Sequence, residues 1–94
     1  MSEVKEIRLG SRYGDTHKLI PVDGYENVYR FKPAQDWMPI YCAYDGHWND
    51  DDEEKELVNL DSDGGPFLTV GMTINGMTIT RLFYKKDVGY LVQF

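Results

Sequence analysis

Apolar and polar residues alternate along most of this chain, in short runs that end at Gly, Pro, Asn or Asp. Because successive side chains of a β-strand point to opposite faces, a period of two predicts strands with one buried face. The 3.6-residue period of an amphipathic helix is weak throughout the sequence. This alternation therefore predicts a mainly-β chain made of short strands.

The strongest turn signal is Asn75-Gly76, which lies between two alternating runs. Both residue types tolerate the positive φ angles of a type I′ turn, so Ile74 and Met77 are expected to pair across it. A second turn then leads into a last strand at 90–94. Three consecutive strands joined by tight turns predict a three-stranded meander at the end of the chain.

Further segments are candidates for the remaining strands: 4–9, 18–22, 25–32, 38–45, 56–61 and the short apolar run 67–70. Pro21 restricts the second of them to a sheet edge or a bulge, because proline has no N–H for the ladder. The segment 38–45 carries apolar residues on both faces, which predicts a central strand covered on both sides. The expected fold is a small single domain over residues 1–94, an antiparallel β-barrel or sandwich of six to seven strands.

Composition favours a folded domain in a reducing compartment. The chain is 41% hydrophobic and 14% aromatic, which supplies enough large side chains for a core. Cys42 is the only cysteine, so no intramolecular disulfide is possible and no cysteine pair suggests a zinc site. The N-terminal residues lack the apolar stretch of a signal peptide, and no segment reaches the roughly 20 apolar residues of a membrane span. We therefore expect a cytoplasmic protein with no membrane partner.

The net charge of −6 is concentrated in residues 45–63. This segment holds nine acids against Lys55, a net of −8, whereas the rest of the chain holds nine Lys or Arg and seven acids, a net of +2. Its densest part, 49–56, is expected to be an acidic loop that leads into the strand at 56–61. One helical turn is the alternative, because Asn49 is a suitable N-cap and acids stabilise a helix N-terminus.

These acids do not match a metal site. A calcium loop places its ligands at alternating positions before a Gly and a bidentate Glu, whereas the acids that follow Asn49 are contiguous. Asp61 and Asp63 have a suitable spacing, but Gly65 and Pro66 occupy the next ligand positions. We expect no metal and no cofactor, and weak cation binding by the acids is left open.

Candidate catalytic residues are sparse. His17 and His47 are the only histidines, and their spacing matches no metal-ligand motif. We expect His47 to be a loop residue. A triad of Ser11, His17 and an aspartate depends on geometry that one sequence does not give. Cys42 alternates with apolar neighbours, which is typical of a buried thiol and not of an activated nucleophile. The chain is therefore expected not to be an enzyme.

Basic residues next to aromatic residues form another candidate surface. Interleaved cations and rings can bind single-stranded nucleic acid through stacking and charge. Alternation alone explains the pattern, because it places the cations on a solvent face and the rings in the core. A strong basic stripe is missing, so no direct binding of nucleic acid is expected. These residues are Arg30, Lys32, Arg81, Lys85 and Lys86, next to Tyr29, Phe31 and Tyr84.

The acidic segment supports two functional hypotheses. In the first, the protein is a non-enzymatic interaction module whose acidic loop docks on a basic partner surface. Its sharpest form is a mobile-element-encoded inhibitor, such as a phage protein, whose carboxylates mimic the charge of nucleic acid toward a nucleic-acid-binding protein. In the second, the protein is a structural or accessory subunit of a larger assembly, and the acidic loop serves only solubility. The candidate partner-binding residues are Trp48, Asp50, Asp51, Asp52, Glu53, Glu54 and Glu56.

Overall fold

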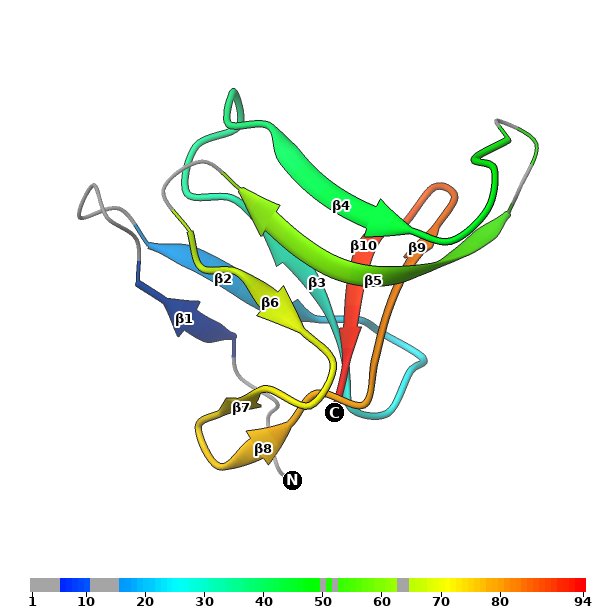
Figure 1. Cartoon of the computed structure of the whole chain (residues 1–94). Helices are drawn as coiled ribbons and strands as arrows, with labels where there is room; N and C mark the ends of the chain where they lie inside the picture. Colours follow the sequence, from blue (N-terminus) through cyan, green and yellow to red (C-terminus); the bar gives the residue numbers. More distant parts are fainter. Residues whose placement is uncertain (1–5, 11–15, 50, 52, 63–64) are drawn as a thin grey trace.

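The computed structural model describes residues 6–10, 16–49, 51, 53–62 and 65–94, and these residues form strands and no helix. The mainly-β prediction is confirmed, and Figure 1 shows the arrangement of the strands. Their bounds are β1 (Ile7–Leu9), β2 (His17–Pro21), β3 (Val28–Lys32), β4 (Ile40–Tyr44), β5 (Glu54–Ser62), β6 (Leu68–Thr69), β7 (Thr73–Ile74), β8 (Met77–Thr78), β9 (Arg81–Lys85) and β10 (Gly89–Gln93).

Eight of these strands form one curved sheet. The hydrogen-bonded order is β1-β2-β3-β10-β9-β5-β4, and β6 pairs with β5 beside this path. The sheet curves so that β4 and β5 lie above β1 and β2 in Figure 1. In the described part of the chain the end strands β1 and β4 do not pair with each other. The described strands therefore form an open sheet, and a closed barrel is not found, whereas the sandwich alternative stays a prediction.

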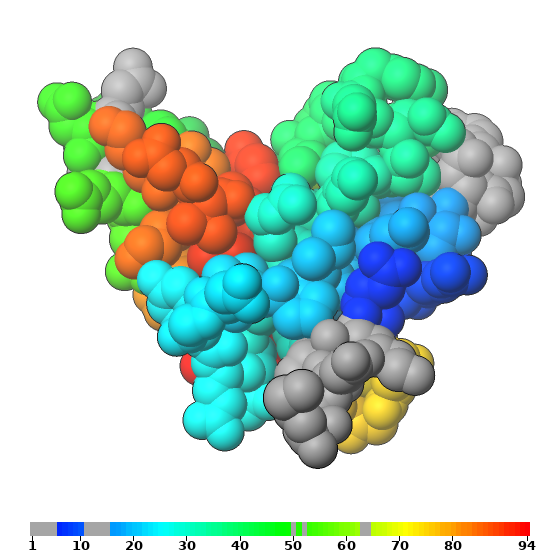
Figure 2. Space-filling view, turned by 180° about the vertical axis from the view of Figure 1, so that it is seen from behind, coloured from blue at the N-terminus to red at the C-terminus, as the bar shows by residue number. Residues whose placement is uncertain are grey.

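β3 and β10 are paired over only part of their length. Their pairing covers only Leu91 to Gln93 of β10, although β10 begins at Gly89 and β3 continues to Lys32. From behind, the surface is hollowed between the turn that follows β9, in orange, and the segment that follows β3, in teal (Figure 2). The two halves of the sheet are therefore joined mainly at the end near the C-terminus.

The hairpin predicted at Asn75-Gly76 is confirmed, but the three-stranded meander is wrong. Both turn residues have positive φ angles, 51° and 80°, and Ile74 pairs with Met77 across them. β7 and β8 form a separate two-stranded sheet. β9 is paired with β10 along one edge and with β5 along the other, so it has no edge left for β8. Ile79 and Thr80 separate the two hairpins, and Ile79 is buried in the core.

The prediction of a central strand at 38–45 is also wrong. β4 lies at the end of the sheet order, and its one partner in the described part of the chain is β5. Tyr41 and Tyr44 are exposed, whereas Ile40 and Cys42 pack against the core. An apolar composition suggests burial on both faces, but only one face of this strand is covered. The nine-residue β5 is central instead, since it pairs with β4, β6 and β9.

Pro21 is the last residue of β2. β2 is internal, between β1 and β3, but its described pairing with β1 extends only as far as Leu19. The edge position predicted for this strand is thus wrong, because β2 has a neighbour on each side, while Pro21 itself lies beyond the described pairing with β1.

The core is divided between the two faces of the sheet. A small cluster on the outer face consists of Val28, Phe83 and Leu91, with Val22 and Val88 packed against it. The main cluster lies inside the curve of the sheet, and adjacent residues of β3, β9 and β10 contribute to opposite clusters, as alternation requires. Its buried members are Ile7, Leu9, Leu19, Tyr29, Phe31, Leu57, Leu60, Leu68, Ile79, Leu82 and Val92.

Candidate functional site

The acidic segment is divided between a loop and β5. The strand begins at Glu54, two residues earlier than predicted, so Glu54 and Glu56 belong to the sheet and not to a loop. Asp51 and Glu53 precede the strand and are exposed. The described residues of this segment contain no helical turn. The acids at the start of β5 are therefore held on a regular backbone.

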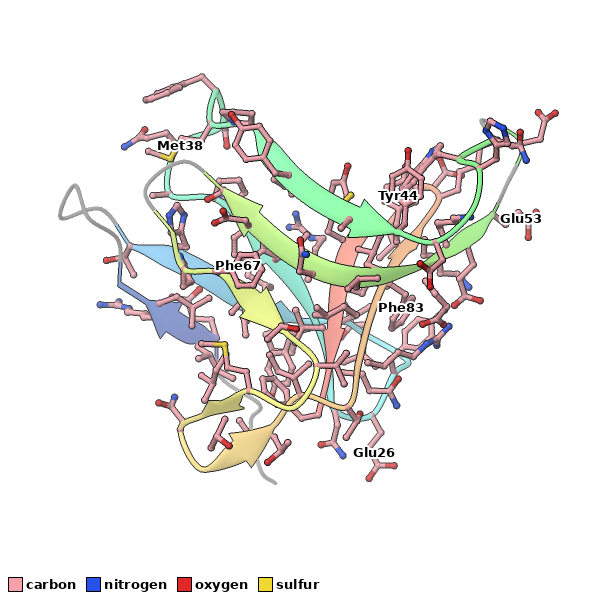
Figure 3. The ribbon with its side chains drawn as sticks, viewed as in Figure 1. Glu26, Met38, Tyr44, Glu53, Phe67 and Phe83 are labelled. Atoms are coloured by element: carbon pink, nitrogen blue, oxygen red, sulfur yellow. The ribbon has the colours of Figure 1, made fainter. Side chains whose placement is uncertain are left out.

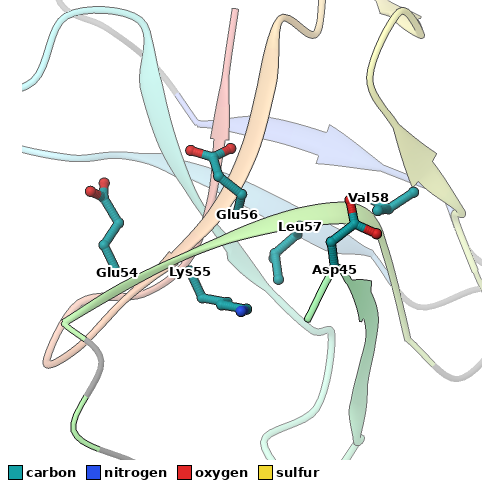
Figure 4. A pocket seen from close by; sticks show the side chains of 6 residues that line it. All are labelled: Asp45, Glu54, Lys55, Glu56, Leu57 and Val58. Atoms are coloured by element: carbon teal, nitrogen blue, oxygen red, sulfur yellow. The ribbon is translucent and has the colours of Figure 1, made fainter. Parts of the chain in front are cut away.

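The first half of β5 has one open edge because β4 is short. Residues 54–57 pair with β9, but β4 ends with Tyr44 opposite Leu57, and the chain leaves the sheet at Asp45. A shallow groove of about 360 Å³ lies at this edge, lined by Asp45 and residues 54–58 (Figure 4). Three carboxylates thus surround one groove, with Val58 at its apolar end.

At the start of β5, alternation places the side chain of Lys55 on the opposite face of the strand from its two acidic neighbours. Glu54 and Glu56 point to one side of the strand and Lys55 to the other (Figure 4). The Lys55 ammonium donates a 2.7 Å hydrogen bond to the carbonyl oxygen of His47 and lies 5.5 Å from the centre of the Tyr44 ring. His47 is an exposed loop residue, as predicted. Lys55 therefore holds the loop that contains His47 against β5.

Arg81 of β9 holds the two strand carboxylates in place. Its guanidinium donates hydrogen bonds to Glu56 and, at 3.3 Å, to Glu54, and it lies 4.0 Å from the centre of the Phe83 ring. The hydrogen bond to Glu56 is the main reason that the pKa of Arg81 is raised above its ordinary value. Exposed pairs of this kind contribute about 0–1 kcal/mol. The pairing therefore orients Glu54 and Glu56 more than it stabilises the fold.

Trp48, predicted as a partner contact, is half-buried in a row of rings. Its ring centre lies 5.0 Å from that of Tyr44 and 5.0 Å from that of Tyr84, and Tyr84 lies 5.1 Å from Tyr90. Trp48, Tyr84 and Tyr90 pack against the main core cluster. The structure gives Trp48 a packing role, and its contact with a partner stays a prediction.

The predicted partner-binding residues are brought together only in part. Figure 3 places Glu53 and Tyr44 at the same end of the β4–β5 pair. Glu54 and Glu56 line the groove there, together with Asp45, which was not in the predicted set. The signal for Asp45 was its place in the segment with a net charge of −8. The remaining predicted acids, Asp50 and Asp52, lie outside the described residues.

His17 is a buried structural residue, and it lies one residue before the strand predicted at 18–22. It begins β2 and is fully buried. Its Nδ1 accepts a 2.9 Å hydrogen bond from the Ala34 backbone N–H, and its Nε2 lies 3.4 Å from Oγ of the buried Ser62. Because Nδ1 is the acceptor, Nε2 carries the hydrogen and cannot take a proton from Ser62. The proposed triad partner Ser11 lies outside the described residues.

Cys42 is half-buried, and burial raises the pKa of its thiol above the ordinary value. A raised pKa lowers the thiolate fraction at pH 8, and the thiolate is the reactive form. We expect iodoacetamide to alkylate the folded protein at pH 8 about tenfold more slowly than the urea-unfolded chain. The difference should shrink as the pH rises above 9. Equal rates at pH 8, measured by mass spectrometry, would contradict the burial of this thiol.

The basic residues and their neighbouring rings lie on opposite faces of the sheet. Tyr29 and Phe31 are buried in the main cluster, whereas Arg30 and Lys32 alternate with them and point outward. Tyr84 packs against the same cluster. The arrangement predicted by alternation is confirmed, and these rings are not available as a stacking platform.

Comparisons with known proteins identify no relative. No protein-family model matches the chain, and neither the curated proteins nor the solved structures give a significant match. Within the described residues, no group of three or more His, Cys, Asp or Glu side chains is placed to hold a metal ion. The described part of the chain also contains no helix that is long and apolar enough to cross a membrane.

Proposed function

We propose that this protein is an interaction module that docks its acidic segment on a basic surface of a partner protein. The observation that carries the proposal is the charge partition, −8 within residues 45–63 and +2 elsewhere. A concentrated charge on a nearly neutral scaffold steers a partner of opposite charge toward one place. The acids of Asp45, Glu54 and Glu56 around one groove support this location.

The partner class that fits best is a nucleic-acid-binding protein. Glu54 and Glu56 lie on the same face of β5, and both carboxylates contact the Arg81 guanidinium, so these two acids and one arginine together leave a net charge of −1. Arg81 fixes both carboxylates, which reduces the conformational entropy lost on binding. Basic grooves that bind nucleic acid recognise spaced negative charges, and the acidic segment imitates them. A nucleic-acid competitor should therefore displace the protein from its partner.

The proposal is tested by capturing partners from extracts of the source cells with three versions of the protein. One is the wild type, and one carries five neutral replacements in the acidic segment: D50N, D51N, D52N, E53Q and E54Q. The third carries five replacements at exposed acids elsewhere: E6Q, D23N, E26Q, D36N and D87N. Both variants lose the same charge, so they separate the effect of position from that of net charge.

The expected result is that the acidic-segment variant loses a partner that the wild type and the control variant retain, and that double-stranded DNA elutes this partner. Equal capture by all three proteins would show that the acidic segment does not dock. Loss of capture by both variants would show that net charge alone is responsible, which also contradicts the proposal.

A second function, a subunit of a larger assembly, is supported by exposed apolar residues outside the acidic segment. Trp37 is 71% exposed and lies between β3 and β4, outside residues 45–63. Sedimentation velocity of the purified protein addresses this alternative directly. A stable oligomer that persists at high salt would favour the subunit function, because apolar contacts are not screened by salt.

A further inference from the structure

The outer face of the β4–β5–β6 part of the sheet exposes large apolar side chains. Tyr41, Val58 and Phe67 are 55%, 47% and 53% exposed. Tyr41 pairs with Asp61 across β4 and β5, while Cys42 and Leu60 pair on the covered face. Phe67, labelled in Figure 3, directly precedes Leu68, which is buried, so it lies on the outer face. Exposed apolar residues gathered on one sheet face are typical of an interaction surface.

β4 adds an open backbone edge to this surface. Among the described residues it pairs only with β5, and from Ile40 to Tyr44 it contains no charged residue and no proline. The other end strand, β1, is protected by charge, because Arg8 is exposed on it and Glu6 lies within 4 Å of both Arg8 and Lys18. Proteins usually place charges or proline on edge strands to prevent pairing. Of the two end strands of the sheet, β4 is therefore the one suited to accept another strand.

The charges around β4 indicate which strand it accepts. Asp45 follows β4 directly, Asp61 lies opposite Tyr41 on β5, and Glu56 lines the adjacent groove. A strand added to β4 would lie about 10 Å from β5, a distance that lysine and aspartate side chains span together. A second copy of this chain would bring these acids toward one another. Charge complementarity therefore favours a cationic occupant over a second copy.

We infer that β4 is a docking edge that takes a lysine- or arginine-containing extended segment of the basic partner as an added strand. Main-chain hydrogen bonds to β4 provide affinity, and Asp45, Asp61 and Glu56 select cationic side chains. Tyr41, which is exposed beside this edge, provides an apolar contact. This inference rests on the proposed function and specifies its geometry, since docking then extends from the acidic segment along the sheet edge.

The probe for this inference is a synthetic eight-residue peptide in which lysine alternates with threonine. A second peptide of the same sequence, with every backbone nitrogen methylated, keeps the charge but has no N–H to donate. Binding to the wild-type protein is measured by fluorescence anisotropy, and amide hydrogen exchange reports on β4. Two variants complete the set: A43K places a cation on the docking edge, and T78K places the same charge on β8, away from it.

The inference predicts that the lysine peptide slows exchange of the β4 amides and binds at least tenfold more tightly than the methylated peptide. A43K should weaken binding about tenfold, and T78K about twofold or less. Equal binding of both peptides without protection of β4 would overturn the added-strand geometry, while the partner-capture experiment would still decide the proposed function. Absence of binding at millimolar peptide would overturn it as well. Protection of β4 by concentration-dependent dimerisation without peptide would identify a second copy as the occupant and also overturn it.

Discussion

Replacing His17 with alanine is expected to lower the free energy of unfolding by about 3–4 kcal/mol. The imidazole is fully buried against Phe31, with ring centres 5.9 Å apart. It joins the start of β2, the end of β5 and the chain after β3 through Ser62 and the Ala34 N–H. The alanine variant leaves a cavity and two buried polar groups without their partner. Urea denaturation followed by tryptophan fluorescence measures the loss.

A double-mutant cycle separates the polar contact from the cavity. S62A alone should cost about 1–2 kcal/mol, because it leaves Nε2–H of His17 without an acceptor. The double variant H17A/S62A should cost about 1 kcal/mol less than the sum of the two single changes. A cost below about 1 kcal/mol for H17A would contradict the buried position of this histidine.

Replacing Phe83 with alanine is expected to cost about 3 kcal/mol, the second large effect. Phe83 is 2% exposed on the outer face of the sheet, where it packs with Val28 and Leu91 beneath Arg81. The change removes this small core and the surface on which the Arg81 guanidinium lies. Arg81 in turn orients the carboxylates of the groove, so the variant should also disturb Glu54 and Glu56.

The control for this prediction is F67A, the same substitution at an exposed phenylalanine. It should change the free energy of unfolding by less than about 0.5 kcal/mol, since Phe67 is 53% exposed. Similar costs for the two variants, in the same urea titration, would show that the outer face has no core of its own.

Local sequence signals were sufficient where one backbone preference decided the structure. Asn75 and Gly76 adopt positive φ angles that few other residues tolerate, and the hairpin formed at the predicted pair, Ile74 and Met77. Alternation correctly placed Tyr29 and Phe31 inside the sheet. In these cases the structural preference depends on residues that are close together in the chain, so it can be recognised in a single sequence.

Long-range pairing accounts for the differences. Whether β4 is an edge or a central strand depends on which strands take the edges of β5, and composition does not encode that choice. The burial of His17 depends on Ser62, which lies 45 residues away in the sequence. The groove depends on β4 ending opposite Leu57 while β5 extends further. Its acids were predicted from charge, but their arrangement around an open edge required the fold.

The central claim, that the acidic segment docks on a basic partner, is tested most directly by the affinity of the captured partner for the three proteins used in the capture experiment. We predict that the acidic-segment variant binds about a hundredfold more weakly than the wild type, and the control variant within about threefold. Raising the salt concentration should weaken wild-type binding further, because the attraction is screened. Three equal affinities that do not change with salt would contradict the claim.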